Sequence, residues 1–236
     1  MSNVSMLLIL GGVFMQNILF ITLLFLTFSF SQETVTFTNC GQTGRLGPSQ
    51  SQCDAEYGAG VVTLDNGIQQ WIAPVTGYYT IEVLGAGRDG YASLALGAKM
   101  KGTFYLEANT TLQILVGQKS DVSTYNWNYP LYPAGSGGTF VALGDHYSTS
   151  SPLIVAGGGG SNGCVGCNSN EMHASSSETA NDGNLGHGGS AGYGGQTNTN
   201  NTWYGGGGGG GFYGNGTNTS NYGPVGIAFV NGGAGG

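Results

Sequence analysis

Glycine is distributed unevenly along this chain of 236 residues, and the distribution limits what the chain can fold into. Residues 157–236 hold 28 of the 47 glycines, in the runs Gly157–Gly160 and Gly205–Gly211 and in the ending Asn231-Gly-Gly-Ala-Gly-Gly236. Glycine loses more backbone entropy on ordering than any other residue. The C-terminal third is therefore either a flexible linker or a structure that only glycine permits.

Aromatic residues in this third favour an ordered structure. They stand within or beside the glycine runs, at Tyr193, Trp203, Tyr204, Phe212, Tyr213 and Tyr222. Flexible linkers lack such anchors. Disordered chains are usually rich in charge and poor in aromatics, whereas here 7% of residues are charged and 11% are aromatic. We expect residues 157–236 to be ordered, with a linker as the alternative.

The charge balance excludes one class of partner. The net charge is −7, and no Lys or Arg follows Lys119. Nucleic-acid binding needs clustered cations that displace counterions from phosphates, so we expect no nucleic-acid partner. An acidic surface suits a basic protein partner, or serves solubility alone.

Residues 1–31 are predicted to be a signal peptide. Ile18–Phe28 is an apolar core of suitable length, and it is followed by the small residues Ser29 and Ser31. The region before this core has no Lys or Arg, so translation from Met15 is one alternative and an uncleaved anchor over residues 6–28 is another. The expected location is secreted or extracellular, with membrane attachment only if the protein continues past Gly236.

Four cysteines fit an oxidising compartment. Cys40 and Cys53 enclose a turn-rich loop, and a disulfide between them would stabilise the fold by about 3 kcal/mol. Cys164 and Cys167 are predicted to form disulfides, either with each other or with a cysteine missing from this chain, and zinc ligation is the alternative. N-glycosylation is predicted at some of four sequons, those of Asn109, Asn200, Asn215 and Asn218.

Short apolar runs between turn residues predict β-strands over residues 61–156. The expected strands are Val61–Leu64, Ile68–Ile72, Tyr78–Leu84, Gly102–Leu106, Thr111–Val116, Thr139–Leu143 and Leu153–Ala156. Tyr79, Ile81 and Val83 alternate with polar residues, which is typical of a half-buried strand. Many short strands separated by turns indicate an all-β antiparallel sandwich or jelly roll.

Motifs that resemble catalytic or cofactor sites are weak. Gly85-Ala-Gly87-Arg-Asp-Gly90 matches a dinucleotide-binding pattern, but no second βα unit follows it. Val116–Ser120 lacks the order and the upstream glycine of a phosphate loop, and neither HRD nor DFG occurs. His146 follows Asp145 without a GxSxG serine, and His173 and His187 are spaced wrongly for a zinc finger. No catalytic residue, cofactor or metal site is predicted.

Several segments, in order, resemble the glycine-rich extracellular domain of the anaplastic lymphoma kinase and leukocyte tyrosine kinase receptor family. The first are Phe37-Thr-Asn-Cys40-Gly and Gly47-Pro-Ser-Gln-Ser-Gln-Cys53. The later ones are Gly67-Ile-Gln-Gln-Trp71, Pro74-Val-Thr-Gly-Tyr-Tyr-Thr-Ile81 with Gly85-Ala, Leu112-Gln-Ile-Leu-Val-Gly-Gln118 and Pro152-Leu-Ile-Val-Ala-Gly-Gly-Gly-Gly160. Each segment alone is weak, and the ordered set is specific.

The resemblance implies a jelly-roll, tumour-necrosis-factor-like sandwich over residues 32–156. Residues 157–236 would continue the same domain as a layer of left-handed extended glycine helices close to polyproline II. The family's domain binds small basic cytokines. Without the later cysteines of the family, a membrane span or a kinase, the chain is expected to be truncated within the domain. The expected function is a non-catalytic extracellular ligand-binding module, and the alternative is a secreted structural or adhesive protein that self-associates.

Overall fold

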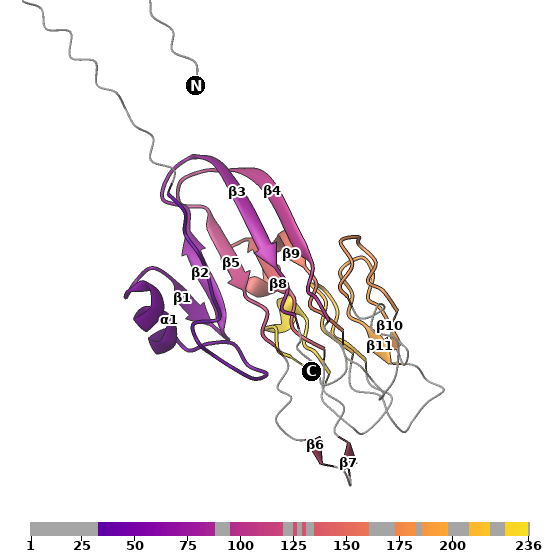
Figure 1. Ribbon diagram of the computed structural model, residues 1–236. Helices are drawn as coiled ribbons and strands as arrows, with labels where there is room; N and C mark the ends of the chain where they lie inside the picture. The colour runs from indigo at the N-terminus through magenta and orange to yellow at the C-terminus, as the bar shows by residue number, and fades with distance from the viewer. Residues whose placement is uncertain are drawn as a thin grey trace, which may run out of the picture. The chain divides into compact units, whose positions relative to one another are not determined.

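The computed structural model describes residues 33–87, 95–119, 135–160, 173–182, 186–197, 208–217 and 225–235, with the short strands at 125–126 and 129–130. Residues 36–236 belong to one compact unit. Its main elements are a helix, α1 (Gln50–Tyr57), and the strands β1 (Thr63–Asp65), β2 (Ile68–Ile72), β3 (Gly77–Leu84), β4 (Lys99–Leu106), β5 (Thr111–Leu115), β8 (Thr139–Leu143) and β9 (Ser151–Ala156) (Figure 1).

The remaining elements are short. The two-residue strands are β6 (Tyr125–Asn126), β7 (Tyr129–Pro130), β10 (Gly186–His187) and β11 (Gln196–Thr197), and they form the pairs β6–β7 and β10–β11. There are also two 3-10 helices, η1 (Tyr147–Thr149), which precedes the glycine-rich third, and η3 (Phe229–Asn231), which lies within it.

The strands form antiparallel sheets. One sheet has five strands in the order β1-β2-β5-β8-β9, and β3 and β4 form a separate two-stranded ribbon. Each of the seven strands predicted from the sequence is present, with ends that differ by a few residues. The prediction of a mostly β, antiparallel fold is therefore confirmed.

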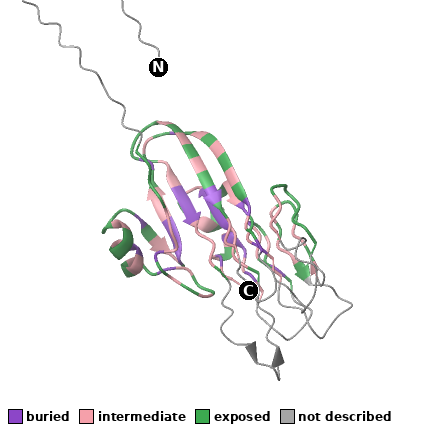
Figure 2. Ribbon diagram, in the orientation of Figure 1, coloured by how far each residue is buried: buried purple, intermediate pink, exposed green. Residues whose placement is uncertain are grey.

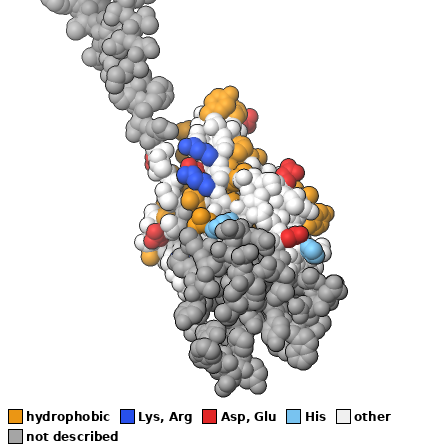
Figure 3. Space-filling view, turned by 45° about the vertical axis from the view of Figure 1, so that its right-hand side comes forward, with side chains coloured by type: hydrophobic (Ala, Val, Ile, Leu, Met, Phe, Trp, Pro, Cys, Tyr) orange, Lys and Arg blue, Asp and Glu red, His pale blue; other side chains and the backbone are white. Residues whose placement is uncertain are grey.

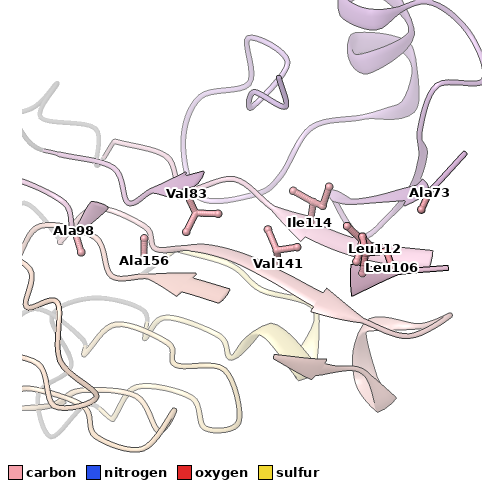
Figure 4. Close-up of a cluster of buried hydrophobic side chains, with 8 residues drawn as sticks. All are labelled: Ala73, Val83, Ala98, Leu106, Leu112, Ile114, Val141 and Ala156. Carbon is pink, nitrogen blue, oxygen red and sulfur yellow. The ribbon is translucent and has the colours of Figure 1, made fainter. Parts of the chain in front are cut away.

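A hydrophobic cluster joins the ribbon to one face of the larger sheet. Its buried members are Ala73, Val83, Ala98, Leu106, Leu112, Ile114, Val141 and Ala156 (Figure 4). Along β3 the alternation is as predicted, because Tyr79, Ile81 and Val83 turn inward and the residues between them are exposed. One face of the ribbon is therefore core and the other faces solvent (Figure 2).

The opposite face of the five-stranded sheet is also covered. Ile68, Phe140 and Ala142 pack there against Phe212 and Phe229, which come from the glycine-rich third. The Phe140 ring centroid lies 5.6 Å from that of Phe229, which stacks on Phe212 at 4.9 Å. Since β8 is covered on both faces, its first four residues are all buried, a pattern expected of a central strand rather than of a half-buried one.

Beyond the ends of the strands, glycine-rich segments lie in direct backbone contact. Ala86 donates its N–H to the Gly137 carbonyl (3.0 Å) and accepts from the Gly159 N–H (2.9 Å). A Cβ placed on Gly85 would overlap the Gly157 carbonyl oxygen, and one on Gly158 would overlap that of Ser136. These contacts draw glycines from both sides of Ala156, so close glycine packing begins within the predicted sandwich segment.

A second group of glycine segments occupies the C-terminal third. Gly208 donates to the Thr217 carbonyl and accepts from the Gly226 N–H, both at 2.9 Å, while Gly195 donates to Gly209 (2.9 Å) and accepts from Thr217 (3.0 Å). Each segment therefore bonds to more than one other segment, unlike an edge strand that pairs on one side. At the described positions residues 208–217 are tied to their neighbours, as expected of an ordered segment.

Helix α1 was not predicted. The sequence between Cys40 and Cys53 was interpreted as a turn-rich loop, yet the helix begins at Gln50 and includes Cys53. Ser49 precedes it, and the Ser49 N–H donates to Gln52 Oε1 at 2.8 Å, which is the reciprocal half of a capping box. The helix has eight residues, too few for apolar periodicity to reveal it.

Candidate interaction surface

The outward face of the β3–β4 ribbon presents exposed side chains in four cross-strand rows. The rows, from one end of the ribbon to the other, are Tyr78 with Tyr105, Thr80 with Thr103, Glu82 with Lys101, and Leu84 with Lys99. All eight residues are classed as exposed. We call this face the ribbon surface.

The tyrosine row is strongly exposed. Tyr78 is 80% exposed and Tyr105 57%, and their rings meet edge to face with centroids 5.3 Å apart. Tyrosine offers a large contact area with few rotatable bonds, so such residues often dominate the energetics of protein interfaces. Leu84, 58% exposed, adds an apolar group at the other end.

Charges occupy the rows at the far end from the tyrosines. Lys99 Nζ lies 2.8 Å from Glu82 Oε1, and Lys101 Nζ lies 3.8 Å from Glu82 Oε2. The hydrogen bond from Lys99 is the main cause of the lowered pKa of Glu82. Desolvation opposes it, and the positive charges of Lys99 and then Lys101 lower the pKa further. Figure 3 shows basic side chains beside an acidic one, with apolar side chains nearby.

The ribbon surface therefore carries a local charge of +1, from two lysines and one glutamate, on a chain of net charge −7. The other acidic residues among the described ones lie elsewhere, at Glu33, Asp54, Glu56, Asp65, Glu107, Asp145, Glu178 and Asp182. An aromatic row next to mixed charges, on a rigid two-stranded scaffold, is suited to contact with another protein.

Cys40 and Cys53 form a disulfide, with an Sγ–Sγ distance of 1.97 Å. It joins the N-terminal segment to α1 and is buried with Val62. Cys164 and Cys167 lie outside the described residues, so their predicted pairing stays a prediction.

Helix α1 covers the edge of the five-stranded sheet at β1. Gln50 Nε2 donates to the Val62 carbonyl (3.0 Å), and Gln50 Oε1 accepts from the Leu64 N–H (2.9 Å). Both backbone groups face outward beside the edge strand β1. The Gln50 amide thus makes the hydrogen bonds that a neighbouring strand would make. The sequence analysis missed this role, and no local sequence pattern indicates it.

Two of the predicted glycosylation sites are described. Asn109 is exposed in the turn between β4 and β5, with φ +69°, and its N–H donates to Ala73 O at 2.8 Å. Asn215 is exposed as well, and its Oδ1 accepts from the Ala228 N–H and from Asn231 Nδ2. Since N-glycans attach at Nδ2, these bonds leave the reactive atom unused. Asn200 and Asn218 lie outside the described residues.

The structure assembles a Ser–His–Asp chain that the sequence did not indicate. Ser148 Oγ lies 2.7 Å from His146 Nδ1, and His146 Nε2 lies 3.2 Å from Asp65 Oδ2. His146 and Asp65 are 48% and 38% exposed, and Nδ1 also accepts the Ser148 N–H as a cap of η1. An activated serine needs a neighbouring base that is available to take its proton, but here His146 Nδ1 is already the acceptor for the Ser148 N–H. The Ser148–His146–Asp65 contacts therefore serve a structural role at the surface, where His146 caps η1 and pairs with Asp65.

The glycine motif after β3 is also used structurally. The Gly85 and Ala86 N–H groups donate to the carbonyls of Ala98 and Gly137, so they are not free for a phosphate; Gly90 lies outside the described residues.

The two other histidines contact different residues. His173 Nδ1 accepts the Leu96 N–H at 2.9 Å, and His187 Nδ1 lies 3.3 Å from Asp182 Oδ2. Among the described residues, no three His, Cys, Asp or Glu side chains gather as a metal site. Nor does this part of the chain contain a helix long and apolar enough to span a membrane.

Comparison with known proteins connects part of the chain to a receptor. The leukocyte tyrosine kinase receptor of Mus musculus is 36% identical over 94 residues, which cover 35% of this chain and 11% of the receptor. No protein-family profile matches the chain. A segment of this chain is therefore a partial homologue of that receptor, and the chain spans only a small part of the receptor's length.

Proposed function

We propose that this chain is a non-catalytic extracellular ligand-binding module of a receptor-like protein. The observation that carries the proposal is the 36% identity over 94 residues with a tyrosine kinase receptor, on an antiparallel β-scaffold. The short matched share of that receptor fits a module without its kinase.

The finer fold belongs to the same proposal. The five-stranded sheet and the ribbon are taken as the two sheets of a tumour-necrosis-factor-like jelly roll. The glycine segments are taken as polyglycine II helices, which bond to neighbours in several directions and need glycine at each close approach. The branching bonds of Gly195, Gly208 and Thr217 support this assignment.

A small basic protein, such as a cytokine, is the ligand class that the charge favours. The chain carries 12 acidic and 5 basic side chains, and two of those basic groups already pair with Glu82. Long-range attraction would raise the association rate, and salt would weaken it.

Binding of secreted cytokines tests the proposal. The full chain, secreted from animal cells with a C-terminal tag, is captured on a biosensor and exposed to a panel of small basic cytokines, with acidic cytokines of similar size as controls. We expect saturable binding by a basic member that weakens as salt rises. Failure of every basic cytokine to bind, with a folded chain on the sensor, would remove the ligand-binding proposal.

The alternative is a secreted structural or adhesive protein. Tyr193 and Tyr213, 64% and 48% exposed beside the glycine segments, favour it because such side chains could join copies. This alternative predicts large, open-ended assemblies that depend on Tyr193 and Tyr213. A receptor module instead remains a small, defined species at the same concentration.

A further inference from the structure

The cross-strand pairs of the ribbon surface indicate which kind of partner fits it. In each row the residue of β3 suits the residue of β4: tyrosine with tyrosine, threonine with threonine, glutamate with lysine, and an aliphatic chain with the stem of a lysine. The Thr80 and Thr103 hydroxyl oxygens lie 3.1 Å apart, and the Glu82–Lys101 pair is open at 3.8 Å.

This pattern makes the ribbon surface complementary to itself. When two ribbons face each other across a two-fold axis parallel to their strands, β3 of one copy lies over β4 of the other. Each residue then lies opposite the second copy's equivalent of its own cross-strand partner. Tyr78 meets Tyr105 of the second copy, and Glu82 meets Lys101 of the second copy. A two-fold contact requires such self-complementarity of one patch.

The charges favour a second copy over other occupants. An acidic partner would meet Glu82, and a basic partner would meet Lys99 and Lys101, so each leaves like charges opposed. A second copy places its Lys101 opposite Glu82 and its Glu82 opposite Lys101, while Lys99 stays paired with Glu82 of its own copy and lies over Leu84 of the other. The four tyrosines of the two rows would form one apolar contact at the end of the interface, where the side chains are most exposed.

We propose that two copies of this chain associate through the ribbon surface, with the Glu82 of each copy paired to the Lys101 of the other. The contact is a closed dimer rather than an open chain, because both copies use the same patch. It needs no ligand, so it stands apart from the ligand-binding proposal and can fail without it.

Exchange of the two charges gives the sharpest test. A Glu82→Lys chain presents two lysines in the third row, and a Lys101→Glu chain presents two glutamates. Each variant alone would oppose like charges across the axis, and we expect its dimer dissociation constant to rise at least about tenfold. Mixed in equal amounts, the two variants restore opposite charges at both contacts, so a mixed dimer of about wild-type affinity is expected.

The measurement is sedimentation velocity of the purified chain over a range of concentrations, with one variant carrying a fluorescent label in the mixture. Tyr78→Ala should also weaken the dimer, whereas Leu46→Ala, an apolar residue 65% exposed outside the ribbon surface, is the control and should not. Circular dichroism and melting of each variant confirm folding. A wild-type chain that stays monomeric at every concentration, or charge variants that associate neither worse alone nor better together, would overturn the proposal.

Discussion

The strands and the glycine segments both reach close packing, but by opposite means. In the strand region, side chains fill the space between the ribbon and the five-stranded sheet, and Val83, Leu106, Leu112 and Val141 are almost fully buried. In the glycine segments, backbones touch with no side chain between them, as where a Cβ on Gly216 would overlap the Gly208 carbonyl oxygen.

The difference shows where stability comes from in each region. Burial of apolar side chains stabilises the strands, at about 25 cal/mol for each Å² removed from water. The glycine segments have little such area and depend on backbone hydrogen bonds in several directions. Phe212 and Phe229 connect the two regions, because these buried side chains of the glycine-rich third pack on the five-stranded sheet. Substitutions that remove one such interaction at a time measure how far the stability of each region depends on it.

The largest effect is expected from Phe229→Ala. Phe229 is fully buried and packs on Phe140 and Phe212, so truncation should cost about 3–5 kcal/mol of unfolding free energy. Urea denaturation of the secreted chain measures this loss. The control is Tyr193→Ala, which is expected to change stability by less than about 0.5 kcal/mol. If the two variants were equally stable, the glycine-rich third would not be part of the folded core.

Loss of the disulfide is expected to be the next largest effect, and it acts on the strand region. Replacing Cys40 and Cys53 together with serine removes a link across a separation of 13 residues and should cost about 3 kcal/mol. Hydrogen exchange should then rise first in α1 and β1, and the glycine segments should keep their protection. Uniform loss of protection would mean that the two regions do not differ as described.

A smaller effect is expected from Gln50→Ala. This change leaves the Val62 carbonyl and the Leu64 N–H without the Gln50 amide, at a cost of about 1 kcal/mol where water reaches them only in part. Ser51→Ala, an exposed neighbour on the same helix, is the control for helix propensity. Denaturant midpoints of the two variants are compared. Equal midpoints would show that water replaces the amide fully at this edge.

The smallest effect concerns pH, and it lies beside the glycine segments. The hydrogen bond from the Gly188 N–H lowers the pKa of Asp182 below its ordinary value of 3.8, and the hydrogen bond from His187 adds a smaller effect in the same direction. A lowered carboxyl pKa adds stability at pH values above 3.8, and that stability is lost as pH falls through the folded-state pKa. Asp182→Asn should therefore melt slightly below wild type near neutral pH, and the gap should close in acid. A gap that widens in acid would contradict the assignment.

Most of the strand region could be predicted because its signal is local. Alternation in Tyr79, Ile81 and Val83, and the turn residues Asp65-Asn-Gly67 before β2, placed the strands within a few residues. Helix α1 was missed because Cys53 and Gln50 stabilise it through bonds to residues outside the helix, which are Cys40, Val62 and Leu64. The pair Ser49 and Gln52, spaced as in a capping box, was the one local signal that could have found it.

The rest depends on contacts between distant segments. Nothing in the sequence distinguishes Gly208, whose Cβ would overlap the Gly195 carbonyl oxygen, from Gly209, which has open space at that position. The rows of the ribbon surface likewise follow from the register of β3 with β4, such as Tyr78 with Tyr105, and register is set by the folded pairing.

That contrast between neighbouring glycines provides the most direct test of the central claim, that the C-terminal glycines form a packed structure. The measurement is the melting temperature of Gly208→Ala against Gly209→Ala in the purified chain of residues 32–236. We predict that Gly208→Ala costs about 1–3 kcal/mol through overpacking, a fall of several degrees, while Gly209→Ala melts within about 2 °C of wild type. Equal melting of both variants at the wild-type temperature would contradict the account, because a flexible linker accepts a methyl group at either position.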